Sequence, residues 1–217
     1  MKRKILIVSP HPDDETLGCG GYILKYKNKY NFHLMLVTKM KTDLKDKKYF
    51  ERTKEIKKMK KKYNFKSLTQ LSYNTTEMDK YSKNEIINNF SKVIKNLRPE
   101  TIMIPSDVDV HTDHKIINEC MISASKSFRN PFINKILEYE VLSETNFSLK
   151  NAFVPNHYVN ISNLMSKKIN ILKIYRSEIK KHPFPRSIDA VKSLAILRGS
   201  QAGCKYAEAF NILFSKS

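Results

Sequence analysis

Short apolar runs recur along the chain, and each of the first four is followed by a polar turn and a segment with helical periodicity. Strands that alternate with helices are typical of a parallel sheet covered by helices on both faces. The sequence therefore predicts an α/β fold with a mostly parallel sheet. The predicted strands are residues 4–8, 33–38, 68–73 and 101–105, and the predicted helices are residues 15–29, 48–63, 83–97 and 114–127.

The last third of the chain continues the alternation less regularly. We expect a strand at 137–142 on the far side of the sheet, followed by a loop and short strand at 143–160 over the pocket. Apolar residues at helical spacing predict a long amphipathic helix at 162–181 and a further helix at 187–202. The final segment, 206–214, is predicted to be a strand at a hairpin edge.

Length and composition narrow the class of protein. The 217 residues are enough for one sizeable domain and few for two, so we expect a single domain over residues 1–217. No stretch has the apolar length of a transmembrane helix, and the apolar run after the basic start is too short for a signal peptide. Three widely spaced cysteines read as reduced thiols, so we expect a cytoplasmic protein. The sequence leaves open whether the protein forms a homo-oligomer.

A dense polar cluster follows the first predicted strand. Ser9-Pro-His11-Pro-Asp13-Asp14-Glu15 places one imidazole and three carboxylates in the turn where the strand ends. In open parallel sheets, ligands bind outside the carboxyl ends of the strands. Imidazole and carboxylate are ligands that Zn²⁺ accepts, so the turn predicts a metal site. The alternative is a surface turn in which Asp14 or Thr16 caps the following helix.

A second polar turn follows the predicted strand at 101–105. It ends in His111-Thr-Asp113-His114 and leads into a helix-like segment. Two turns that follow two parallel strands face each other across the same sheet edge. The pair of turns therefore offers three protein ligands with a place left for water, which is the usual arrangement of catalytic zinc.

The two motifs together resemble the PIG-L/LmbE family of zinc-dependent N-deacetylases. The resemblance rests on His11-Pro-Asp-Asp-Glu-Thr-Leu-Gly-Cys-Gly-Gly21 and on His111-Thr-Asp-His114. It continues more weakly at Arg52-Thr-Lys-Glu55 and at 198–210, and the 143–160 region matches poorly. The resemblance implies a Rossmann-like three-layer fold without a dinucleotide, and an enzyme that releases acetate and a free amine from an N-acetylglucosamine-type conjugate.

The resemblance also implies roles for individual side chains around Zn²⁺, although Fe²⁺ would accept the same ligands. His11, Asp14 and His114 would hold the metal, and Asp13 would act as general base. His111 would stabilise the oxyanion, and Asp113 would orient a histidine. Spacing alone would permit Asp13 and Asp14 to exchange roles.

Candidate substrate contacts are less specific. The resemblance suggests that Arg52 holds substrate oxygens, whereas its spacing to Glu55 equally fits an ion pair within one helix. Asn74 follows the predicted strand at 68–73, where the family often has an aspartate, and is taken as a second substrate-binding residue. A lone histidine, His157, is a further candidate.

The formal net charge of +19 raises the question of a nucleic-acid partner. Lysine is abundant everywhere, and no nucleic-acid motif is present, so we interpret the charge as solvated helix faces. The same charge could steer an anionic acetamido-sugar conjugate to the site. Two alternatives stay open: hydrolysis of another amide or ester bond, and a basic binding protein without activity.

Overall fold

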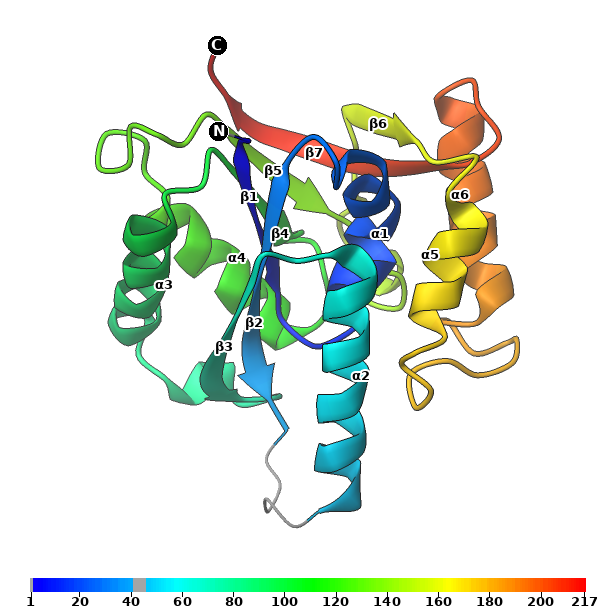
Figure 1. Ribbon diagram of the computed structural model, residues 1–217, viewed down its shortest axis with the longest axis horizontal. Helices are drawn as coiled ribbons and strands as arrows, with labels where there is room; N and C mark the ends of the chain where they lie inside the picture. Colours follow the sequence, from blue (N-terminus) through cyan, green and yellow to red (C-terminus); the bar gives the residue numbers. More distant parts are fainter. Residues whose placement is uncertain (1, 41–45) are drawn as a thin grey trace.

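The computed structural model describes residues 2–40 and 46–217 and contains one seven-stranded mixed sheet (Figure 1). The strand order is β3-β2-β1-β4-β5-β7-β6. All neighbours from β3 to β5 pair in parallel, and β7 runs antiparallel to both β5 and β6. The predicted α/β class with a mostly parallel sheet is confirmed. The strands are β1 Lys4–Ser9, β2 Asn31–Lys39, β3 Ser67–Asn74, β4 Thr101–Pro105, β5 Lys135–Tyr139, β6 His157–Asn160 and β7 Ala207–Ser215.

Helices cover both faces of this sheet. In Figure 1, α3 and α4 lie on one side, and α1, α2, α5 and α6 lie on the other. Two short 3-10 helices, η1 Met78–Lys80 and η2 Thr145–Phe147, lie in the connections. Within the described residues, no helix is both long and apolar enough to cross a membrane. The helices are α1 Asp14–Tyr26, α2 Lys47–Tyr63, α3 Lys83–Leu97, α4 Thr112–Ala124, α5 Met165–Leu172 and α6 Ile188–Gln201.

The apolar strand residues divide between two buried clusters because successive side chains of a strand point to opposite faces. Ile5 and Ile7 pack with α1, α2, α5 and α6, while Leu6 and Val8 pack with α3 and α4. The central strands are therefore buried on both faces, which explains why they read as continuous apolar runs. The result is the three-layer arrangement expected from the sequence.

The last strands differ from the prediction. The segment predicted at 137–142 is β5, and it lies inside the sheet between β4 and β7. The final strand was expected at a hairpin edge, but β7 lies between β5 and β6, and the four-residue β6 forms the edge. The edge prediction is wrong because β6 pairs along the outer side of β7, from His157–Phe210 to Asn160–Ala207.

The long helix predicted at 162–181 is also wrong. Only Met165–Leu172 is helical, and residues 173–187 form a connection of turns between α5 and α6. Contacts with distant segments fix this connection: the Tyr175 hydroxyl donates to Glu15 (2.9 Å), and the Arg176 backbone N–H donates to Glu55 (3.1 Å). These bonds replace helical ones, and they place the connection beside the polar turn that follows β1.

Close packing explains the three glycines of α1. A Cβ atom on Gly18 would collide with the Tyr139 ring, and one on Gly21 would lie 2.5 Å from a methyl group of Ile161. The helix thus lies closer to β5 and to the connection between β6 and α5 than side chains would allow. This spacing sets the position of the N-terminus of α1, where the candidate ligands are.

Candidate metal centre

Two turns meet at the carboxyl ends of β1 and β4, which are neighbours in the sheet. The first carries His11 and Asp14, and the second carries His114 at the start of α4. The distance from His11 Nδ1 to Asp14 Oδ2 is 3.4 Å, and that from His114 Nε2 to Asp14 Oδ2 is 3.3 Å. His11 Nδ1 and His114 Nε2 are 3.2 Å apart. These three atoms form a nearly equilateral triangle.

The triangle has the size of one face of a zinc tetrahedron. Ligand atoms about 2.0–2.1 Å from a tetrahedral Zn²⁺ are roughly 3.3 Å from each other. Two imidazole nitrogens and one carboxylate oxygen are also a donor set that zinc accepts. The residues present therefore fit the metal implied by the sequence.

His111 is the third imidazole of the cluster, and its ligand atom lies within 4.8 Å of those of His11 and His114. Its Nδ1 accepts the backbone N–H of Asp113 (3.1 Å) at the N-terminus of α4. Burial, together with the charges of the other two histidines, lowers the pKa of His111 to about 4. A neutral ring whose Nδ1 accepts a hydrogen bond carries its proton on Nε2, so it presents a donor.

Buried carboxylates orient both candidate histidine ligands. Asp113 Oδ2 is 3.0 Å from His11 Nε2 and accepts the Thr76 backbone N–H at 2.7 Å. Asp109 Oδ2 is 2.7 Å from His114 Nδ1, and its other oxygen accepts the Thr145 hydroxyl. Such carboxylate–histidine pairs fix the ring orientation at metal sites.

Sequence reasoning placed Asp113 beside a histidine but missed Asp109. The signal was present, because Asp109 lies five residues before His114 in the same turn. A buried histidine ligand usually donates its second ring N–H to a carboxylate, so a nearby aspartate was the natural partner. The contribution of Thr145 comes from a distant loop, and the sequence pattern contains no signal for it.

Asp13 stands at the junction between the turn and α1. Its carbonyl accepts the backbone N–H groups of Thr16 and Leu17, both at 2.9 Å, and so begins the helix. Its backbone has φ 123°, a conformation that L-residues rarely adopt, while its side chain makes no capping bond. The alternative in which Asp14 or Thr16 caps the helix is wrong, because Asp13 is the capping residue and Asp14 instead accepts the His11 backbone N–H at 2.8 Å.

The buried side chain of Glu15 holds this strained turn in place. It is fully buried and accepts the Asp13 backbone N–H (3.1 Å), the Thr16 hydroxyl (2.6 Å) and the Tyr175 hydroxyl (2.9 Å). Burial raises its pKa, and these hydrogen bonds act against that effect. The sequence motif predicts no separate role for Glu15, and the structure shows that Glu15 anchors the turn.

The histidines and Asp14 stabilise opposite charges on each other. Burial acts to lower the pKa of His11, but hydrogen bonds to Asp113 and Asp14 outweigh it and raise the pKa to about 9. The pKa of His114 rises to about 10, because Asp14 and Asp109 outweigh its burial. Burial would raise the pKa of Asp14, but His114 and His11 lower it below its usual range. By contrast, burial and the charge of Asp14 raise the pKa of Asp13.

Contact of the expected substrate-binding residues with substrate stays a prediction. Arg52 of α2 ion-pairs with Glu178 and lies 3.3 Å from Glu55, so the expected pair within the helix is present. Asn74, at the end of β3, donates to Glu77 (3.0 Å). His157 is the first residue of the edge strand β6, and its ring centroid is 6.2 Å from that of Phe210.

Comparisons with known proteins agree with this fold. The chain is 23% identical to the diacetylchitobiose deacetylase of Thermococcus kodakarensis, over 97% of this chain and 83% of that protein. Its fold matches that of a conserved protein from Thermus thermophilus, with a TM-score of 0.80, 22% identity and coverage of 98% and 96% of the two chains. It also matches the 4-carboxy-2-hydroxymuconate hydratase from Pseudomonas putida, with a TM-score of 0.74, 14% identity and coverage of 99% and 98%.

A family model covers the part of the chain that carries both turns. The model, described as PIG-L, GlcNAc-PI de-N-acetylase, matches residues 6–125. The matched region extends from β1 to the end of α4, so it includes all of the candidate metal ligands and the carboxylates that orient them. Because the match covers more than half of the 217 residues, the chain belongs to the PIG-L family.

Proposed function

We propose that this protein is a metal-dependent hydrolase that removes the acetyl group from an N-acetylated amino-sugar conjugate. Acetate and a free amine are the products. The observation that carries the proposal is the triangle of His11, Asp14 and His114, with both imidazoles oriented by buried carboxylates. Membership of the PIG-L family and likeness to a diacetylchitobiose deacetylase support the assignment of the N-acetyl C–N bond as the bond that is cut.

The metal proposed for this triangle is Zn²⁺, held by His11, Asp14 and His114. Fe²⁺ would accept the same donors. When bound, the ion supplies Lewis acidity and lowers the pKa of a water to about 7. The free cysteines Cys19, Cys120 and Cys204 fit a reducing compartment, and we propose the cytoplasm as the place of action.

Asp13 is the proposed general base. Its carboxyl is buried, is not used for capping, and is next in the chain to a proposed ligand. It accepts a proton from the attacking water as the water oxygen bonds to the acetyl carbonyl carbon. The C–N bond then breaks, and the same proton passes from Asp13 to the departing nitrogen.

His111 is proposed to stabilise the negative charge that develops on the carbonyl oxygen. Its neutral ring has a proton on Nε2, as the bond from the Asp113 backbone N–H to Nδ1 requires. A preorganised donor of this kind contributes about 3 kcal/mol to stabilisation of the transition state. A protonated Nε2 has no lone pair for a metal, which favours Asp14 over His111 as third ligand.

Acetate release tests the proposal directly. Purified protein is assayed against a panel of N-acetylglucosamine conjugates as isolated, after chelation, and after return of zinc. We expect acetate that disappears on chelation and returns with zinc. Release that is indifferent to chelation would contradict a metal-dependent reaction.

The second candidate function is a reaction at a different bond of the substrate, because a hydratase shares this fold at a TM-score of 0.74. The same metal centre would then act on another amide or ester, or on a double bond. Screening all products, and not acetate alone, separates these reactions. Zinc bound at one equivalent without acetate from any conjugate would move the proposal to another substrate.

A further inference from the structure

A groove of 530 Å³ lies between α2 and the connection that joins α5 to α6. This volume is within the range of small-molecule sites. Arg52 and Glu178 are among its lining residues, and the end of the groove at Arg52 is called the inner end below. The guanidinium of Arg52 lies 5.5 Å from the centre of the Tyr175 ring, and the Tyr175 hydroxyl donates to Glu15, the residue after Asp14. The groove therefore begins beside the candidate metal centre and runs outward along α2.

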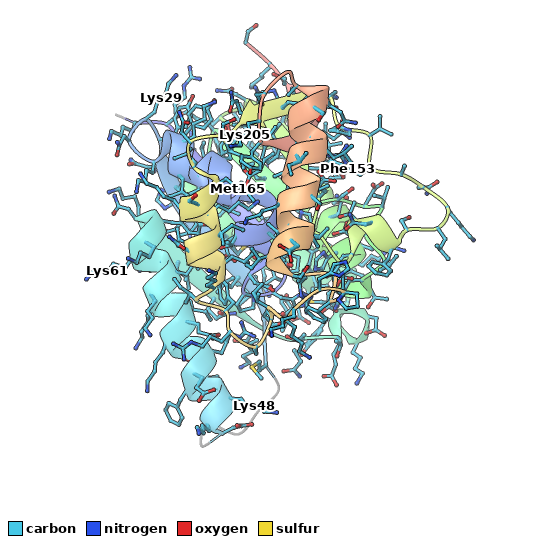
Figure 2. All side chains as sticks on the ribbon, turned by 90° about the vertical axis from the view of Figure 1, so that its right-hand side faces the viewer. Lys29, Lys48, Lys61, Phe153, Met165 and Lys205 are labelled. Carbon is cyan, nitrogen blue, oxygen red and sulfur yellow. The ribbon has the colours of Figure 1, made fainter. Side chains whose placement is uncertain are left out.

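The walls of the groove are rich in cations. In addition to Arg52, they include side chains of α2 and of the connection, namely Lys48, Lys54, Lys58 and Arg176. Lys48 lies at one end of α2, and the helix extends from there along the edge of the molecule in Figure 2. Three acidic side chains also line the groove: Glu51, Glu55 and Glu178.

Two of these three acids are already engaged. Glu178 ion-pairs with both Arg52 and Arg186, the latter at 3.2 Å. Glu55 lies 3.3 Å from Arg52 and accepts the Arg176 backbone N–H. By contrast, within residues 2–40 and 46–217, no ion pair forms at the side chains of Lys48, Lys54, Lys58 and Arg176. Over these same ranges, four uncompensated cations thus face one free carboxylate, that of Glu51.

One donor at the inner end makes no hydrogen bond among the described residues. Nη2 of Arg52 donates to Ser177 (3.0 Å) and Glu178, whereas its buried Nη1 lies 3.3 Å from a Glu55 oxygen without hydrogen-bond geometry. A buried guanidinium N–H without a hydrogen bond is costly, and a ligand oxygen would satisfy it. The groove therefore combines an unsatisfied donor at its inner end with free positive charge farther out.

We propose that this groove is a subsite for an oxyanion, a phosphate or a carboxylate, on the group attached to the amino sugar. The acetamido sugar would occupy the metal centre, and the attached group would extend past Arg52 to Lys58 and Arg176. This inference rests on the proposed function for the sugar, but the charge of the groove is an independent observation. It narrows the substrate class to anionic conjugates.

Two neighbouring lysines give a matched test. Lys58 lines the groove, whereas Lys57, on the same helix, does not. Charge reversal of either one changes the net charge of the protein identically. Lys58→Glu is expected to lower the affinity for an anionic conjugate about 3- to 10-fold, because this charge would lie close to the bound anion. Lys57→Glu is expected to lower that affinity less than about 2-fold, because this charge would lie farther from the anion and be screened by salt.

The measurement is calorimetric binding to the zinc-loaded Asp13→Asn protein, so that binding does not depend on turnover. The probes are N-acetylglucosamine 1-phosphate, N-acetylmuramic acid as the carboxylate, and neutral methyl N-acetylglucosaminide. We expect preference for one or both anionic probes, reduced by Lys58→Glu and weakened as salt rises. The anionic probe that shows this preference identifies the oxyanion.

Equal binding of charged and neutral probes would overturn the groove proposal, as would equal effects of Lys57→Glu and Lys58→Glu. The proposed function is judged separately by acetate release from the wild-type protein. Acetate from neutral conjugates without any preference for anionic probes would keep the deacetylase and remove the subsite. Lys58-dependent binding without acetate would keep the subsite and remove the deacetylase.

Discussion

Asp13 and Asp14 are adjacent in the chain, yet their surroundings separate them chemically. Asp14 faces two histidines that hold its pKa low against the effect of burial, so it is ionised and ready to bind a cation. Asp13 is buried beside the charge of Asp14, and its pKa is raised. Two carboxyl groups with opposite shifts are typical of a division between ligand and base.

Substitution of each aspartate separates the two roles. Asp13→Asn is expected to retain zinc and to lose about 10²- to 10⁴-fold in kcat, the usual contribution of a general base. Asp14→Asn is expected to lose the metal itself. Bound zinc per protein and kcat for acetate release are measured on both variants. A metal-free Asp13 variant beside a zinc-loaded Asp14 variant would show that the roles are reversed.

The pKa values of the histidines predict how pH acts on metal-dependent stability. In the metal-free protein, His11 and His114 have pKa values of about 9 and 10, above the usual 6.5. Their contribution to folding is therefore fully present below about pH 6.5 and is lost as pH rises through 9 to 10. Zinc needs both rings deprotonated, so it binds better as pH rises.

The gap in Tm between zinc-loaded and chelated protein is thus expected to widen from about pH 7 to about pH 9.5. Differential scanning calorimetry of both forms measures it. The His114→Ala variant is the control, because its Tm should not respond to zinc at any pH. A gap that stays constant or narrows with rising pH would contradict the pKa values given for these rings.

For individual residues, the sequence was informative about the site where the residues belong to a recognisable motif. His11, Asp14 and His114 were predicted to meet, and the structure brings them within 3.4 Å of one another. Asp109, which orients His114, has no motif of its own and was missed. The role of Tyr175 depends on a contact with Glu15 across 160 residues, which no local pattern encodes.

At the level of the elements, the position of α1 is held by a buried ion pair whose two side chains come from distant segments of the chain. Lys168 of α5 donates to Glu208 of β7 and to the Leu17 carbonyl of α1, both at 2.7 Å. Glu208 also accepts the backbone N–H groups of Gly21 and Tyr22. The pair therefore joins α1, α5 and β7 at the point where the glycines bring α1 close to its neighbours.

Removal of one partner should be costly because the other remains buried and charged. Lys168→Met is expected to lower the free energy of unfolding by about 3–5 kcal/mol. Urea denaturation followed by circular dichroism measures it. The control is Lys83→Met, which breaks the exposed pair with Glu119 and should change stability little. Equal effects of the two substitutions would contradict the buried pair as a main support of α1.

The elements themselves were predictable wherever local periodicity decides them. The first four strands and the four helices that follow them begin and end within a few residues of the predicted bounds. The prediction failed at 162–181, because periodicity continues through residues that distant partners hold in turns. The place of β7 inside the sheet depends on pairing with β5 and β6, a tertiary choice that a single strand pattern does not determine.

For the whole molecule, the net charge of +19 is the property most open to misinterpretation. The labelled lysines in Figure 2, Lys29, Lys48, Lys61 and Lys205, are spread from one end of the view to the other. Lys48 and Lys61 belong to α2, whereas Lys29 and Lys205 lie in other parts of the chain. The densest run, Lys57-Lys58-Met59-Lys60-Lys61-Lys62, lies near the C-terminal end of α2. A nucleic-acid site would instead gather its cations on one broad face of the molecule.

We therefore expect only weak, non-specific DNA binding, with Kd above about 10⁻⁶ M near 0.15 M salt. Fluorescence anisotropy with labelled duplex and single-stranded DNA, at about 0.05 and 0.15 M salt, measures it. The triple variant Lys60→Gln, Lys61→Gln, Lys62→Gln should lower any residual binding only in proportion to the charge removed, because the positive field comes from the whole surface. Tight, salt-sensitive binding at the higher salt concentration that this variant abolishes would establish a basic patch at the end of α2, and with it a nucleic-acid partner.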